Sequence, residues 1–82
     1  MNFNEIKNIA NEYADLFIQN EKEFIEKYND SILLYTVSEQ IAIVDLMNIY
    51  CLYKTGDIDR VEALDMQKDI RETYEGELAK VI

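Results

Sequence analysis

The chain has 82 residues and a net charge of −9, from 17 acidic and 8 basic side chains, and it contains neither histidine nor proline. A chain of this length is expected to form one domain of marginal stability. Tight helix packing or oligomerisation must therefore supply the remaining stability. The acidity excludes unaided binding to nucleic acid or to an anionic membrane and favours a protein partner with a basic surface.

Residues 4–28 are predicted to form the first helix. Their apolar side chains recur at steps of three and four residues, which is the spacing of one helical stripe. The stripe consists of Ile6, Ile9, Tyr13, Leu16, Phe17, Phe24 and Tyr28. Asn4 is expected to cap the helix, with Glu5 in its first turn. The opposite face is acidic and includes Glu12, Asp15, Glu23 and Glu26.

The turn residues Asn29-Asp30-Ser31 end this helix. Residues 32–35 fit a helical turn, a short extended segment or the start of the next helix. Thr36 and Glu39 have the spacing of a capping box, in which each side chain satisfies the free backbone N–H of the other residue. The second helix is therefore expected over residues 37–54.

The second helix contains the most apolar stretch of the chain. Eleven of the thirteen residues from Ile41 to Tyr53 are apolar, and Asp45 and Asn48 are the exceptions. The abundance of Ile, Val and Tyr also fits a strand. The stretch exceeds ordinary strand length, however, and its two polar residues are three apart and share one helical face. We therefore predict a helix.

A helix that is apolar nearly all round must be buried nearly all round. Two neighbouring helices of a small chain cover only part of it, and an exposed apolar patch usually marks an interface. We therefore predict a two-fold homodimer, or a hetero-complex, through this helix. The expected interface residues are Ile43, Val44, Met47, Tyr50 and Cys51.

Thr55-Gly56-Asp57 predicts the turn between the second and third helices. Gly56 is expected to take the left-handed conformation that closes a helix, and Asp57 is expected to cap the next one. The third helix is expected over residues 58–75, with Gly76 at its end. Its apolar stripe consists of Ala63, Met66, Ile70 and Tyr74, and Leu78, Val81 and Ile82 join it if the helix continues.

These elements predict an all-α fold in a single domain covering residues 1–82. Short connections between the helices favour a small antiparallel three-helix bundle or a helical hairpin assembly.

The third helix also carries an acidic face. Its carboxylates step by three, four and three residues, so they share one arc and repeat every ~4.5–6 Å, close to the phosphate spacing of a nucleic-acid strand. They are Glu62, Asp65, Asp69 and Glu72. One interpretation is a solvated face. The other is a phosphate-like array that binds a basic nucleic-acid-binding site on a partner, as in an inhibitor encoded by a phage or mobile element.

The sequence provides little for catalysis. Histidine, the commonest general base and metal ligand, is absent. Cys51 lies in an apolar helix, which is expected to raise its pKa and make it inert. Neither a glycine-rich phosphate loop nor a calcium-loop pattern occurs. We therefore expect no catalytic residue, no metal and no cofactor.

The N-terminal residues lack the pattern of a secretory signal, and the apolar stretch is too short to cross a bilayer. A cytoplasmic location is expected. The function expected from the sequence is that of a small acidic binding protein, not an enzyme, that acts through protein–protein contacts. The alternative is a structural homo-oligomerisation module whose acidity only confers solubility.

Overall fold

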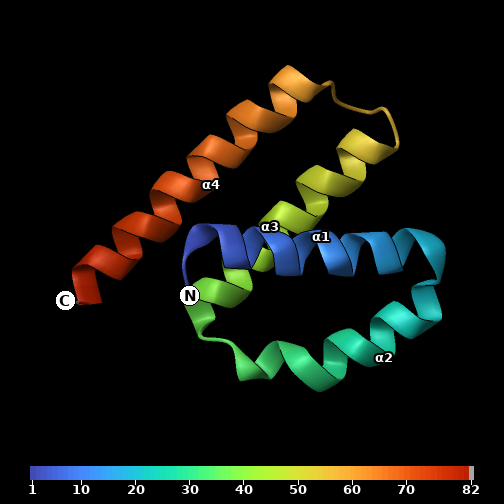
Figure 1. Ribbon diagram of the computed structural model, residues 1–82, viewed down its shortest axis with the longest axis horizontal. Helices are drawn as coiled ribbons and strands as arrows, with labels where there is room; N and C mark the ends of the chain where they lie inside the picture. The colour runs from blue at the N-terminus through green and yellow to red at the C-terminus, as the bar shows by residue number, and fades with distance from the viewer. Residues whose placement is uncertain (82) are drawn as a thin grey trace.

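The computed structural model describes the backbone of residues 1–81 and the side chains of residues 1–77. The described chain forms four α-helices and one 3-10 helix (Figure 1). They are α1 (Phe3–Gln19), α2 (Glu21–Ser31), η1 (Ile32–Leu34), α3 (Val37–Lys54) and α4 (Arg60–Val81). No strand occurs among the described residues, and the all-α prediction is confirmed.

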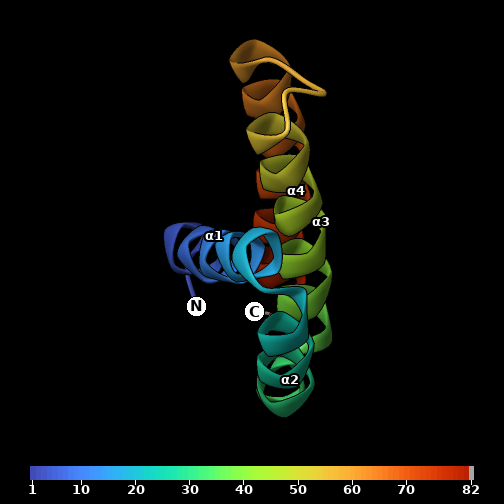
Figure 2. The same ribbon diagram turned by 90° about the vertical axis from the view of Figure 1, so that its right-hand side faces the viewer.

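The helices are arranged in a flat molecule, whose Cα atoms span 39 × 33 × 14 Å. α3 and α4 run antiparallel as a hairpin, and α2 folds back beneath α1 (Figure 1). Figure 2 shows that α2, α3 and α4 lie in one layer and that α1 stands on one side of it. α1 therefore covers one side of the α3–α4 hairpin, while no described helix lies on the other side.

The core lies where α1 packs against α3. Ile6 of α1 and Ile43 of α3 are fully buried there, and each such side chain stabilises the fold by roughly 1.5–3 kcal/mol relative to an exposed one. Tyr74 of α4 belongs to the same cluster, and its hydroxyl donates a hydrogen bond of 2.6 Å to the carbonyl oxygen of Met1. The core thus holds the start of the chain against α4.

The expected helix over residues 4–28 is divided at Asn20. Asn20 is extended, and its side chain accepts a hydrogen bond from the backbone N–H of Glu23, so it caps α2. The reversal lets Phe24 pack against Phe17 and Tyr13, with ring centroids 5.4 and 6.1 Å apart. One straight helix of this length would extend about 37 Å and would carry Phe24 away from these rings.

The capping prediction for the second helix is confirmed, and that for the first helix is wrong. Thr36 and Glu39 form the expected capping box, with N···O distances of 2.8 and 3.2 Å. The first helix, in contrast, is capped by Asn2, whose side chain accepts from the N–H of Glu5, and not by Asn4. Of the three conformations considered for residues 32–35, the structure has a helical turn, η1.

The turn between α3 and α4 contains Gly56 with φ of +83°, as expected. Asp57, however, does not cap the next helix: its carboxylate accepts from the Thr55 hydroxyl, and Asp59 accepts from the N–H of Glu62. α4 therefore begins at Arg60 and continues past Gly76 to Val81. The expected docking of Leu78, Val81 and Ile82 lies outside the described side chains.

Candidate functional site

The uncovered side of the α3–α4 hairpin holds a groove between the two helices. It consists of two adjoining cavities of about 450 and 360 Å³, which share Asp45, Asp69 and Ile70. The wall formed by α3 includes Val37, Ile41, Asp45, Asn48 and Leu52. The wall formed by α4 includes Met66, Asp69, Ile70, Thr73 and Glu77. No residue of α1 or α2 lines it.

The groove is acidic and apolar. Asp45, Asp69 and Glu77 line it, and neither lysine nor arginine is among the lining residues that the structure describes. Between these carboxylates lie large apolar side chains that remain open to solvent, such as Ile41 and Met66, which are 57% and 40% exposed. A concave surface of one charge raises the local concentration of ligands of the opposite charge. The arrangement therefore suits a ligand that is both basic and apolar.

An exposed apolar patch adjoins one end of the groove. It consists of Leu33, Leu34, Val37 and Ile41, which are 80%, 82%, 71% and 57% exposed. Ile32 is the residue of η1 that enters the core, so the two leucines after it point outward. Val37 and Ile41 belong to both the patch and the groove. Large apolar side chains exposed close together along one segment commonly mark an interaction surface.

The acidic face expected on the third helix is exposed throughout. Glu62, Asp65, Asp69 and Glu72 all lie on the side of α4 that faces away from the core. None of them forms an ion pair with a described residue, since the pairs of the described side chains join Met1 to Glu39 and Arg71 to Glu75. Asp69 belongs to both surfaces, and the acidic face therefore borders the groove.

The expected interface residues are not all accessible to a partner. Ile43 is 0% exposed, and its assignment to an interface is wrong because it packs inside its own chain against α1. Met47 packs against the core, and Tyr50 lines a pocket on the side covered by α1. Val44 and Cys51 are partly exposed.

The exposed apolar residues of α3 on its open side are Val37 and Ile41, which lie at or before the start of the apolar stretch. Their spacing of four residues places them on the same face as Asp45, and this spacing is visible in the sequence.

Cys51 is the one thiol of the chain and is partly buried. Burial raises its pKa, and the nearby Asp15 carboxylate raises it further. A thiol with a raised pKa carries little thiolate at neutral pH and is a poor nucleophile. Among the described residues, no group of three or more cysteine, aspartate and glutamate side chains is placed to hold a metal ion.

Comparisons of this chain with family models, with curated proteins and with solved structures find no match. None of the helices, in the part of the chain that the structure describes, has both the length and the apolar character needed to cross a membrane.

Proposed function

We propose that the protein is a non-enzymatic binding protein whose acidic groove between α3 and α4 takes a basic, amphipathic segment of a protein partner. The observation that carries the proposal is the composition of the groove: its described lining has three carboxylates, no basic side chain, and solvent-open apolar residues between the carboxylates. Carboxylates at the rim would pair with lysine or arginine, while the apolar walls would take the apolar face of the segment.

The shape of the groove favours a helix as the bound segment. From Val37 to Leu52 the wall of α3 extends about 22 Å, which matches about four turns of a bound helix. An amphipathic helix placed there would pack against both α3 and α4 on the side that α1 leaves open. Recognition of this kind depends on apolar anchors spaced three and four residues apart.

Charge argues against a second copy of the chain as the occupant. A two-fold dimer through the groove would bring Asp45 and Asp69 of one copy close to the same carboxylates of the other. Like charges set against each other at an interface are unfavourable and exclude partners of that sign. The homodimer expected from the sequence is supported instead by the patch of Leu33, Leu34, Val37 and Ile41, which contains no carboxylate.

Nucleic-acid mimicry is a narrower form of the proposal. Its support is the exposure and regular spacing of the acidic face of α4. Asp65 and Glu72 belong to this face but not to the groove, so Asp65→Lys with Glu72→Lys tests the face alone. If the partner binds through mimicry, this double reversal weakens binding strongly, and DNA competes for the same partner site. If neither occurs, the acidic face is only solvated.

The proposal is tested with a synthetic helical peptide of about 16 residues, with leucines three and four apart and lysines beside them. Fluorescence anisotropy measures its binding across a salt series, because contacts between exposed charges weaken with salt. The peptide is expected to bind, and a matched peptide with glutamate in place of lysine is not. Asp45→Asn with Asp69→Asn should weaken binding about tenfold or more.

The matched control is Glu26→Gln with Asp30→Asn, which removes the same charge from the exposed surface of α2. Equal weakening by both double variants would show that net charge alone attracts the peptide. This result would refute the groove as the binding site. Light scattering at roughly tens of micromolar protein, the range for weak interfaces, measures whether the chain forms a homodimer. A dimer that excludes the peptide would assign the groove, or the patch that shares Val37 and Ile41 with it, to a second copy.

A further inference from the structure

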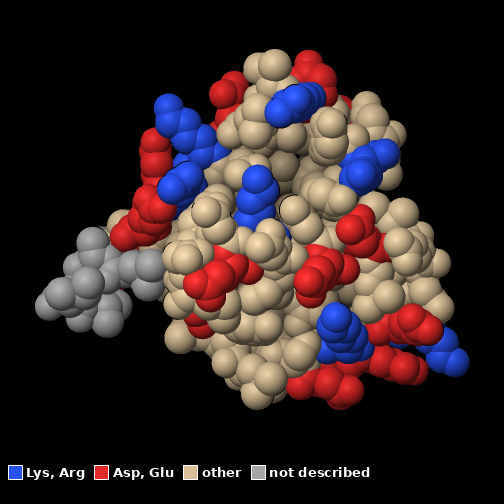
Figure 3. Space-filling model, in the orientation of Figure 1, with Lys and Arg blue, Asp and Glu red and all other residues tan. Residues whose placement is uncertain are grey.

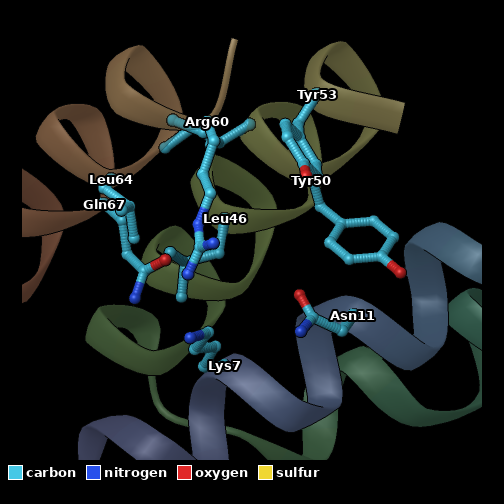
Figure 4. A pocket seen from close by; sticks show the side chains of 10 residues that line it. Lys7, Asn11, Leu46, Tyr50, Tyr53, Arg60, Leu64 and Gln67 are labelled. Atoms are coloured by element: carbon cyan, nitrogen blue, oxygen red, sulfur yellow. The ribbon is translucent and has the colours of Figure 1, made fainter. Parts of the chain in front are cut away.

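The side of the hairpin that α1 covers holds a separate pocket of about 270 Å³. Polar side chains from three helices line it: Lys7 and Asn11 of α1, Tyr50 and Tyr53 of α3, and Arg60 and Gln67 of α4. Leu46 and Ile49, both nearly buried, contribute apolar surface. Figure 4 shows the side chain of Arg60 extending from the start of α4 towards Lys7 on α1.

The charge of this pocket is opposite to that of the chain. Acidic side chains outnumber basic ones by 17 to 8 in the sequence, yet the described lining of the pocket has two basic residues and no acidic residue. In Figure 3, which views the face bearing α1, several separate lysine and arginine side chains lie in the upper half, with acidic side chains at its edges. A positive recess on an anionic protein concentrates small anions locally.

Neither basic residue of the pocket has a charged or aromatic partner among the described residues. Among the described residues, Lys7 and Arg60 form no ion pair, and neither lies over an aromatic ring, whereas Lys27, Lys54 and Arg71 do. Two cations that converge without a carboxylate repel each other, and this repulsion is removed when an anion binds between them. The structure provides no anion of its own for this position within the described residues.

We infer that this pocket binds a small organic anion, a phosphate or carboxylate joined to an aromatic or apolar group. The guanidinium of Arg60 and the ammonium of Lys7 would hold the anionic oxygens, since hydrogen bonds between charged groups are the strong ones. The amides of Asn11 and Gln67 add donors beside them. The rings of Tyr50 and Tyr53, with Leu46 and Ile49, would contact the apolar group.

The size and position of the pocket agree with a small ligand. Ligand pockets commonly measure about 300–1,000 Å³, and 270 Å³ lies just below this range, which limits the ligand to a small molecule such as one with a single ring. The bound anion would join α1 to α4 through Lys7 and Arg60. Since only the folded chain has this pocket, binding stabilises the fold in proportion to ligand concentration. The inference does not depend on the groove, which lies on the other side of the hairpin.

The test is a titration of the ¹⁵N-labelled chain with phenyl phosphate, followed by nuclear magnetic resonance. We expect shifts of the amide signals of Lys7, Asn11, Arg60 and Gln67, and none with phenol, which has the ring without the charge. Inorganic phosphate, which lacks the ring, is expected to bind at least several-fold more weakly. Benzoate distinguishes the two anions: tighter binding than phenyl phosphate assigns a carboxylate, and weaker binding assigns a phosphate.

Lys7→Gln with Arg60→Gln should weaken phenyl phosphate binding about tenfold or more, because both charged contacts are lost. The control is Lys22→Gln with Lys68→Gln, which removes the same charge from exposed positions that do not line the pocket. It should change the affinity less than about twofold. Circular dichroism verifies that both double variants fold.

Three results would overturn the inference: no shift at millimolar phenyl phosphate or benzoate, shifts confined to residues outside the pocket, or equal weakening by the two double variants.

Discussion

The recesses on the two sides of the α3–α4 hairpin are lined by charges of opposite sign, although α3 and α4 contribute to both. The open side presents Asp45, Asp69 and Glu77 around apolar residues, and the side that α1 covers presents Lys7 and Arg60. Along the sequence these charges are interspersed. Their separation arises because residues three and four apart share a helical face, and because α1 brings a lysine to one side only.

The comparison also shows what a helical hairpin gains from an added helix. On the side of α1 the apolar residues of α3 are buried, as Ile43 and Leu46 show. On the open side Val37 and Ile41 remain 71% and 57% exposed. The covered side thus has an apolar core beneath a small polar pocket. The open side keeps solvent-exposed apolar surface of the kind that a protein partner would bury.

The largest expected loss of stability comes from truncating Ile43, which packs between α3 and α1. Ile43→Ala should destabilise the fold by about 3 kcal/mol, since a fully buried isoleucine loses its packing and leaves a cavity. Ile41→Ala, at an exposed position of the same helix, should cost less than about 0.5 kcal/mol. Urea denaturation measures both. Equal costs would mean that α1 does not cover one side selectively.

Glu39 is the one buried carboxylate among the described side chains and belongs to neither charged side. The hydrogen bond from the backbone N–H of Thr36 lowers its pKa below the ordinary value of 4.5, and the Met1 ammonium, 3.5 Å away, lowers it further. Because the unfolded state binds the proton more tightly, this stabilisation is present at neutral pH and is lost as pH falls below about 4.5.

Glu39→Gln should therefore cost about 1 kcal/mol at pH 7 and lose less stability than the parent on acidification. Denaturation at neutral and acidic pH measures this difference. Glu72→Gln, at an exposed position of α4, should retain the acid sensitivity of the parent. If the Glu39 and Glu72 variants show the same dependence on pH, the buried carboxylate is not its source.

The turn that aligns the two helices should respond to the conformation of its glycine. Gly56→Ala is expected to destabilise by about 1 kcal/mol, although a Cβ there meets no atom within 4 Å, because φ is +83°. Gly76→Ala, also sterically free but within α4, should stabilise by up to about 1 kcal/mol. Melting temperatures that move in the same direction would contradict this assignment of the two glycines.

Local signals explain which parts of this fold could be predicted. The capping box of Thr36 and Glu39 and the left-handed Gly56 bracket α3, and its predicted bounds, 37–54, agree with the structure. The break at Asn20 was not predicted, because it depends on packing between rings that are distant along a straight helix. Which side of α3 is exposed could not be predicted either, since an apolar stretch does not reveal where α1 crosses it.

The acidic face of α4 and the pocket also differ in whether the sequence predicts them. The acidic face of α4 follows from residue spacing within one helix and was predicted as an exposed array. The pocket joins Lys7 to Arg60, which are far apart in the chain and have no common pattern. A site assembled by tertiary contact leaves no signal in a single sequence, whereas a site on one helix does.

The smallest expected effect distinguishes the two aspartates that precede α4. Asp59 accepts a hydrogen bond of 2.9 Å from the N–H of Glu62, so Asp59→Ala should cost about 1 kcal/mol through a lost cap. Asp57 accepts only from the Thr55 hydroxyl at an exposed position, and Asp57→Ala should change the free energy of unfolding by less than about 0.5 kcal/mol.

This difference also bears on the pocket, because the first turn of α4 carries Arg60. If the cap holds that turn in place, Asp59→Ala should weaken phenyl phosphate binding severalfold, while Asp57→Ala should leave it unchanged. Thermal unfolding and the same resonance titration measure the two effects on one pair of proteins. A larger loss of stability in the Asp57 variant would mean that α4 begins two residues earlier, which would alter the direction in which Arg60 points.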